Sequence, residues 1–128
     1  MTKDAAPLIE SINAITLIVS DMAQAVAFYQ ALGFEMSYGG PGTRFTSFHV
    51  GRGHLNLMAA RAGQLAGSYD GWGRFIIYVA DVDAMYDRTI AKGLTPEFAP
   101  RDANWGERYF HIRDPDGHEV SFARPLEK

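Results

Sequence analysis

The sequence predicts an α+β fold in which two tandem βαβββ modules form a curved mixed sheet around a concavity. The segment 14–33 (AITLIVSDMAQAVAFYQALG) aligns without a gap on the segment 74–93 (RFIIYVADVDAMYDRTIAKG). Each copy first alternates apolar and other residues, as a half-buried strand does, and then changes to a helical period. One supersecondary unit therefore occurs twice. The alternative is a coincidental agreement between two ordinary strand–helix units, which recur in many folds.

In each copy an aspartate follows the strand and a glycine closes the helix. Asp21 and Asp81 stand where an N-cap is needed, and Asp is a favoured N-cap residue. Gln24 follows Asp21 at the spacing of a capping box. Gly33 and Gly93 stand at the helix ends, where glycine tolerates a left-handed conformation. We therefore expect one helix between each aspartate and its glycine.

Segments rich in turn-forming residues follow each helix and separate short strand-like runs. The expected strands cover 34–38, 44–50 and 54–59 after the first helix, and 95–98, 107–113 and 119–123 after the second. The first module then spans 12–60 and the second 74–124, joined by a glycine-rich linker at 61–73. A chain of 128 residues suits one well-buried core, so a single domain over 1–128 is expected.

The composition limits the classes of partner. A formal net charge of −3 without a cluster of Lys or Arg argues against nucleic acid and anionic membranes. The absence of cysteine excludes disulfides and thiolate chemistry and suits a reducing cytoplasm. The longest apolar run, 75–80, is far shorter than the roughly 20 residues of a membrane helix. We therefore expect a cytoplasmic protein without nucleic-acid or membrane partners.

Two stretches resemble a known family. LIVSDMAQAVAFYQALGF (17–34) and WGERYFHIRDPDGHEVSF (105–122) look like the glyoxalase, bleomycin-resistance and extradiol-dioxygenase superfamily, also called vicinal oxygen chelate proteins. The resemblance covers about 12–124 and implies the glyoxalase/bleomycin-resistance fold with a concave ligand cavity. The DPDG element alone indicates no more than a hairpin turn. Because the superfamily contains metal enzymes and metal-free binders, the fold does not decide the function.

The resemblance also implies where a metal would bind. In the metalloenzymes of the superfamily the ligands occupy four strand positions, which fall here on Ala14, Asn56, Arg74 and Ser121. A methyl group, an amide, a permanent cation and a hydroxyl cannot replace the imidazole or carboxylate ligands of a divalent metal. We therefore expect neither a metal nor another cofactor. In this respect the pattern is closest to the metal-free bleomycin-resistance-like members.

Strand alternation predicts which side chains face the concavity. They mix aromatic, polar and charged types, as a face that binds a small organic molecule does. The candidate ligand-binding residues are Trp105, Tyr109, His111, Arg74, Tyr78, Asn56, Phe45, His49 and Ser121. The alternative for the whole face is a solvated or dimer-facing sheet surface. The alternatives for single residues are a packing role for each histidine, a core plug for Trp105, and an Arg74–Glu119 ion pair.

The favoured function is a metal-free small-molecule-binding protein with no catalytic residue. It would sequester an aromatic or antibiotic-like ligand in a cavity that a homodimer completes. One alternative is a lyase, isomerase or dioxygenase of the superfamily, with an acid or base among His54, Tyr78, His111 and Glu119 or with a displaced metal site. Another is an accessory module whose concave face is filled by a partner. The sequence leaves open whether the modules pair within or between chains.

Overall fold

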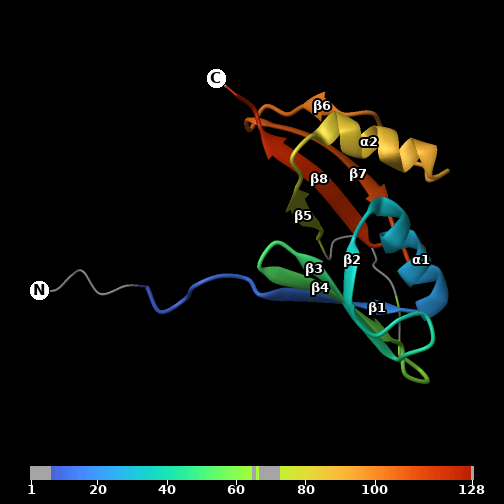
Figure 1. Ribbon diagram of the computed structural model, residues 1–128. Coiled ribbons are helices and arrows are strands. Elements are labelled where there is room, and N and C mark those ends of the chain that lie inside the picture. Colours follow the sequence, from blue (N-terminus) through green and yellow to red (C-terminus); the bar gives the residue numbers. More distant parts are fainter. Residues whose placement is uncertain (1–6, 65, 67–72, 128) are drawn as a thin grey trace, which may run out of the picture.

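The computed structural model describes residues 7–64, 66 and 73–127 (Figure 1). The order βαβββ occurs twice along the chain, as predicted. The elements are β1 (Ala14–Val19), α1 (Met22–Leu32), β2 (Glu35–Tyr38), β3 (Phe45–Val50), β4 (Gly53–Ala59), β5 (Phe75–Tyr78), α2 (Val82–Ala91), β6 (Arg101–Asp102), β7 (Glu107–Arg113) and β8 (Glu119–Pro125). Trp72 and most of the expected linker lie outside the described residues, and the module bounds stay predictions.

The strands form two four-stranded mixed sheets. The first sheet has the order β1-β4-β3-β2 and the second the order β5-β8-β7-β6. In each sheet the first strand of the module is parallel to the last, and the other pairings are antiparallel. The predicted α+β class is therefore confirmed, with the curved sheet divided into two. β1 and β5 each stand at the end of a strand order.

Both helices begin at the predicted caps, and α1 also ends as predicted. α2 ends at Ala91 with Lys92 as its C-cap, and Gly93, with a φ of +79°, follows one residue later. The Asp21 carboxylate accepts a hydrogen bond from the Gln24 amide, and the Asp81 carboxylate accepts one from the Ala84 amide, each at 3.0 Å. Gly33 closes α1 with a φ of +103°, in the left-handed region that favours glycine. A Cβ at Gly33 would meet the Arg88 guanidinium, which is the movable end of a flexible side chain, so the positive φ is the main reason for glycine at the end of α1.

One predicted strand, 95–98, is wrong. The residues that pair with β7 are Arg101 and Asp102, which form the two-residue strand β6. Pro96 has no N–H to donate to a ladder. The one backbone hydrogen bond of this stretch among the described residues runs from the Glu97 amide to the His111 carbonyl, at 3.0 Å. The stretch instead directs the Glu97 and Phe98 side chains toward His111.

The core contains the apolar set that the strand alternation predicts. Its strand members include Leu17, Val19, Phe48, Leu55, Leu57, Phe75, Phe110, Ile112, Val120 and Phe122, all buried. α1 contacts β4, and α2 contacts β7 and β8, so both helices lie on the core side of the sheets (Figure 1). The opposite side of the second sheet is its open face, defined by alternate residues of β5, β7 and β8. These residues are Arg74 just before β5, then Ile76, Tyr78, Glu107, Tyr109, His111, Arg113, Glu119 and Ser121.

The DPDG turn joins the second sheet to the first βα unit. The buried Tyr29 hydroxyl donates to Asp114 Oδ2 at 2.8 Å, and the Ser20 hydroxyl donates to Asp116 Oδ1 at 2.7 Å. His118 Nε2 lies 3.0 Å from the Ile18 carbonyl oxygen. Burial raises the pKa of the Asp114 carboxyl, and burial together with Asp114 raises the pKa of Tyr29. The turn motif is therefore a docking element in this chain as well as a hairpin.

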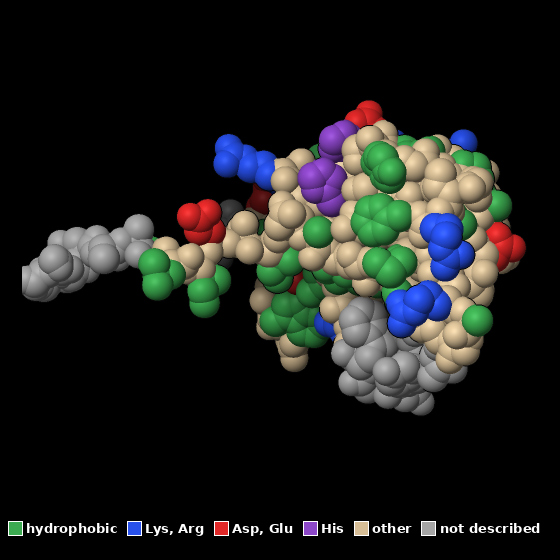
Figure 2. Space-filling model, turned by 90° about the horizontal axis from the view of Figure 1, so that it is seen from below, with side chains coloured by type: hydrophobic (Ala, Val, Ile, Leu, Met, Phe, Trp, Pro, Cys, Tyr) green, Lys and Arg blue, Asp and Glu red, His purple; other side chains and the backbone are tan. Residues whose placement is uncertain are grey.

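Residues 7–13 extend from the body as an arm without secondary structure (Figure 2). Its side chains Leu8, Ile9 and Ile12 are almost fully exposed. No helix of the described part is long and apolar enough to cross a membrane. Leu8, Ile9 and Ile12 give the arm apolar surface that this chain alone does not bury.

Candidate ligand-binding site

Three aromatic side chains form a wall on the open face around one carboxylate. Trp105 Nε1 donates to Glu107 Oε1 at 3.0 Å, and the Tyr78 hydroxyl donates to Glu107 Oε2. The Tyr109 ring lies 5.3 Å from that of Trp105. The hydrogen bond to Glu107 raises the pKa of the Tyr78 hydroxyl, with smaller contributions from burial and charge. Glu107 therefore fixes two rings that remain 56% and 57% exposed.

The start of β7 positions this aromatic wall. Gly106 has a φ of +96°, and its amide donates to the Ala103 carbonyl at 3.1 Å, which closes a turn directly before the strand. Trp105 thus leaves the turn next to the first residues of β7. The Glu107 role is one that the sequence reasoning missed. The available signal was its spacing of two from Tyr109, which places both on the same face of a strand.

A polar cluster lies further along β7. His111 Nε2 is 2.6 Å from Glu97 Oε1, and His111 Nδ1 is 3.6 Å from Glu119 Oε2. Arg113 donates to Glu97 Oε2 at 2.8 Å and to Glu119 Oε1 at 3.2 Å. Arg74 Nε lies 3.7 Å from Glu119 Oε2, so the Arg74–Glu119 pair considered from the sequence is present. Glu97 is a second member of the site that sequence reasoning missed, because the stretch 95–98 was expected to be a strand and its path as a loop was not predicted.

The polar cluster has the residue types of a metal site but lacks the net negative charge that would attract a cation. One ligand atom each of Glu97, His111 and Glu119 lies within 4.8 Å of the others. However, Arg113 bonds to both carboxylates and Arg74 contacts one of them, so two fixed positive charges already neutralise them. A divalent ion would lie beside both guanidinium groups, where repulsion opposes binding. We therefore assign no metal to this cluster, and the expected absence of a metal stays a prediction.

Two buried polar atoms of the open face have no hydrogen-bond partner among the described residues. They are His111 Nδ1 and Ser121 Oγ. His111 pairs with Ser121 in the register of β7 and β8, so the two side chains are neighbours on one face. An unsatisfied buried polar atom costs about 1–3 kcal/mol, so these atoms indicate a place for a further partner.

The structure divides the nine predicted ligand-binding residues between the two sheets. Trp105, Tyr109, His111, Arg74, Tyr78 and Ser121 lie at the second sheet. Asn56, Phe45 and His49 lie on the first, where Asn56 Nδ2 donates to Thr16 Oγ1 at 3.2 Å. The His49 and His54 rings are 5.7 Å apart, and Figure 2 shows two histidines side by side near hydrophobic side chains. The first group shares an aromatic wall and a polar cluster, so it forms the candidate site.

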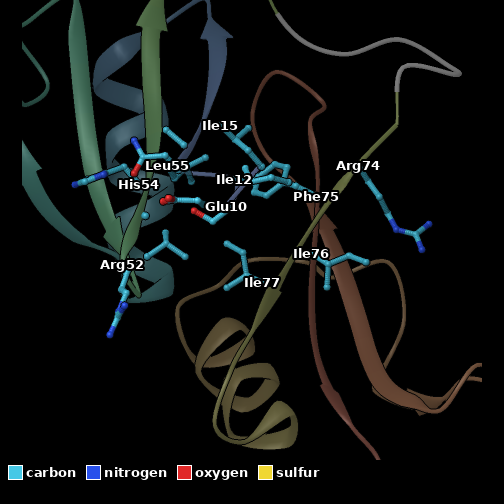
Figure 3. A pocket seen from close by; sticks show the side chains of 15 residues that line it. Glu10, Ile12, Ile15, Arg52, His54, Leu55, Arg74, Phe75, Ile76 and Ile77 are labelled. Atoms are coloured by element: carbon cyan, nitrogen blue, oxygen red, sulfur yellow. The ribbon is translucent and has the colours of Figure 1, made fainter. Parts of the chain in front are cut away.

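A separate cavity of about 810 Å³ lies between β1, β4 and β5. Figure 3 shows Ile15, Leu55 and Ile77 toward its interior, while Arg52 and Arg74 extend away on opposite sides. Arg74 is its only lining residue among the predicted ligand-binding set. The cavity is therefore mainly apolar and adjoins the candidate site at one corner.

The comparisons with known proteins agree with this architecture. The model of the Glyoxalase/Bleomycin resistance protein/Dioxygenase superfamily matches residues 11–122. The chain belongs to this superfamily. As a member, it is 31% identical over 123 residues to the uncharacterised protein YraH of Bacillus subtilis, covering 88% of this chain and 96% of YraH. The suspected family resemblance is thereby confirmed.

Solved structures of the superfamily fold include proteins with different names. A lactoylglutathione lyase from Agrobacterium tumefaciens has a TM-score of 0.73 and 26% identity, over 91% of this chain and 95% of that chain. TioX from Micromonospora sp. ML1 has a TM-score of 0.71 and 26% identity, over 91% of this chain and 100% of TioX. Superfamily membership therefore does not determine the specific function, which depends on the residues of the site.

Proposed function

We propose that this superfamily member binds a small aromatic or antibiotic-like molecule on the open face of its second sheet, without a metal. The observation that carries the proposal is the aromatic wall of Trp105, Tyr78 and Tyr109. Exposed rings are costly to order in water, yet Glu107 holds two of them by hydrogen bonds. Rings fixed in this way offer planar surface for stacking at little further entropic cost.

A second copy of the chain completes the site in this proposal. Ile76, Tyr78 and Trp105 expose apolar surface on one side of the second sheet. β1 and β5 are terminal strands of their sheets, and unpaired strand edges favour association. The arm at residues 7–13 adds apolar side chains that the chain itself does not cover. A two-fold dimer would bury these surfaces and enclose the open face.

The binding proposal is tested by ligand-induced stabilisation and by removal of the Trp105 ring. Bleomycin and smaller planar aromatic compounds are added in a thermal-shift screen, because a ligand at about 100 times its dissociation constant stabilises by about 2.7 kcal/mol. For any compound that binds, Trp105→Ala is expected to weaken affinity more than roughly tenfold in calorimetry. The reason is the loss of the stacking surface together with the hydrogen bond from Trp105 Nε1 to Glu107.

Two further variants separate the contributions of Trp105. Trp105→Phe keeps a ring but loses the donor to Glu107, so it should retain most of the stacking and bind with intermediate affinity. Ile90→Ala alters a similarly exposed apolar residue on α2 and should leave affinity unchanged. Equal affinity of Trp105→Ala and the unmodified protein would assign Trp105 to structure instead of binding.

An enzyme of the superfamily is the second candidate. The observation that favours it is the polar cluster, in which a histidine ring lies between two carboxylates. Such an arrangement can hold and move a proton without a metal. It shares the open face with the aromatic wall, so binding and proton transfer are compatible.

A further inference from the structure

The Glu107 carboxylate differs from its neighbours at the second sheet in the charge of its partners. Its two oxygens accept hydrogen bonds from the Trp105 indole and the Tyr78 hydroxyl. No basic side chain in the described part of the chain lies within ion-pair distance of it. By contrast, an arginine contacts each of four other carboxylates around this sheet, those of Glu97, Glu119, Asp83 and Asp102. The negative charge of Glu107 is therefore not paired by any described residue.

The two donors orient the Glu107 carboxylate without cancelling its charge, because both are neutral groups. The hydrogen bond to Glu107 raises the pKa of Tyr78 above its ordinary value of 10.0, which keeps the hydroxyl protonated at neutral pH. A carboxylate offers about four lone-pair sites, and these donors use two of them. Glu107 is half-buried, and the two rings that bond to it are more than half exposed. A ligand on the open face can therefore reach the carboxylate.

The aromatic rings around Glu107 favour the same sign of charge in a ligand. The face of an aromatic ring is negative and attracts a cation placed over it. One such contact is present beside the wall, where Arg101 Cζ lies 3.6 Å from the centroid of the Phe98 ring and 5.7 Å from that of Tyr109. Neither Trp105 nor Tyr78 has a cation over its ring among the described residues. These two rings therefore remain available to a cation from outside the chain.

The rest of the open face does not supply the missing positive charge. In the polar cluster, the carboxylates of Glu97 and Glu119 meet the guanidinium groups of Arg113 and Arg74, so their charges compensate each other. Arg101 lies closest to Phe98 and makes no ion pair with Glu107. A carboxylate between exposed rings thus stays without a counter-ion within the described chain.

We propose that the aromatic wall and Glu107 together bind an organic cation, namely a quaternary ammonium or protonated amine carried by an aromatic ring. The charged group would lie against the Glu107 carboxylate and the faces of Trp105 and Tyr78, while the ligand ring stacks on the wall. Aromatic rings are a known means of recognising quaternary ammonium groups, and a carboxylate adds a direct charge interaction. This inference rests on the proposed function, because it adds a charge to the aromatic ligand of the same site.

Two probes of nearly equal shape and different charge test the inference. (3-Hydroxyphenyl)trimethylammonium carries the cation, and 3-tert-butylphenol has carbon in place of the charged nitrogen. In calorimetry at neutral pH, the full-length protein is expected to bind the cation at least about tenfold more tightly than the neutral probe. The reason is that the ring faces and the Glu107 charge attract only the cation, whereas both probes offer the same apolar surface.

Glu107→Gln separates the carboxylate from the rings, because it keeps the size of the side chain and removes its charge. The preference for the cation is expected to fall by at least about threefold, the size of effect typical of a partly exposed ion pair. Binding of 3-tert-butylphenol should remain, which shows that the site is still folded. Asp87→Asn removes the same unit of charge from an exposed position on α2 and should keep the full preference.

The outcomes separate this inference from the proposed function. Equal affinity of the unmodified protein for both probes would leave the aromatic site in place and refute the cation. A preference that is unchanged in Glu107→Gln would refute Glu107 as the counter-ion. Tighter binding of 3-hydroxybenzoate than of either probe, lost in Arg101→Gln, would replace the cation by an anion. Failure of both probes to bind would count against both proposals.

Discussion

Tyr29 and Asp114 show how single residues fix the relation between the two modules. They come from α1 and from the turn before β8, and both are buried. Asp114 Oδ1 accepts from the amides of Asp116 and His118, so the Tyr29 hydroxyl is the remaining donor to the carboxyl, at Oδ2. A buried carboxyl with all these donors present is compatible with the core, and the loss of one donor is costly.

Tyr29→Phe is therefore expected to destabilise the protein by about 1–3 kcal/mol, because it leaves Asp114 Oδ2 without its donor in a buried site. The measurement is urea unfolding followed by circular dichroism. Tyr86→Phe is the matched control, because Tyr86 packs against Phe110 and its hydroxyl makes no hydrogen bond within the described part of the chain. Its effect should stay within about 0.5 kcal/mol.

The pH dependence of this destabilisation has a definite sign. Burial raises the folded pKa of Asp114 above its ordinary value of 3.8, and the Tyr29 hydrogen bond lowers it in part. Removal of the hydroxyl raises the folded pKa further. Stability is therefore lost as pH rises through the window that begins near 3.8 and ends at the folded pKa. The Tyr29→Phe effect should be smaller below this window than above it, and an effect independent of pH would contradict the role of Asp114.

At the residue scale, the sequence predicted which face of a sheet a side chain occupies better than it predicted which groups that side chain contacts. Strand alternation placed Tyr109 and His111 opposite Phe110 and Ile112, and the burial agrees. The two carboxylates that organise the site, Glu97 and Glu107, were not predicted. Alternation assigns a residue to a face, but hydrogen-bond partners depend on loop paths and side-chain reach. Glu97 reaches His111 only because its loop turns back toward β7.

At the scale of elements, the two helices depend on their caps to different degrees. α1 buries six residues, including Phe28, Tyr29 and Leu32, whereas α2 buries Val82, Met85 and Thr89. Packing stabilises most helices in proteins more than intrinsic propensity does. The stability of the N-terminal end of α2 therefore depends more on local interactions. Among them are the Asp81 cap and the acidic residue Asp83 in the first turn.

Asp81→Ala is expected to cost about 0.5–2 kcal/mol by removing the acceptor for the Ala84 amide. Because α2 has the smaller buried face, the first turn of α2 should also lose protection in amide hydrogen exchange before β7 and β8 do. Asp87→Ala, an exposed position within α2, is the control and should change neither quantity. Uniform loss of protection across the whole chain would show that the cap acts only on global stability.

The contrast between the caps and the failed strand at 95–98 has a local explanation. A cap is defined by one side chain and an amide three residues later, so the sequence contains all of it. A strand exists only when a distant partner pairs with it. The second module has its second strand, β6, at Arg101–Asp102, where Tyr109 and Arg108 are in register. Propensity at 95–98 cannot supply that partner.

At the scale of the whole molecule, the sheets leave surface that a single chain does not bury. Each sheet ends in a terminal strand, β1 or β5, and the open face lies on the same sheet as β5. The repeat in the sequence predicted two equivalent modules, and the observed sheets have the same order of strands. How the modules of two chains meet depends on complementary surfaces, which a single sequence does not specify.

The homodimer is tested by a charge placed on the open face. In size-exclusion chromatography with light scattering, the protein is expected to have the mass of two 14.1-kDa chains. Ile76→Lys should weaken the association at least roughly tenfold, because an interface would have to bury an unpaired ammonium group. Ile90→Lys on α2 is a close control, since Ile76 is 47% and Ile90 48% exposed, and it should leave the mass unchanged. A dimer that resists Ile76→Lys but dissociates on removal of residues 7–13 would place the interface at the arm, and the open face would then remain accessible to ligand in each chain.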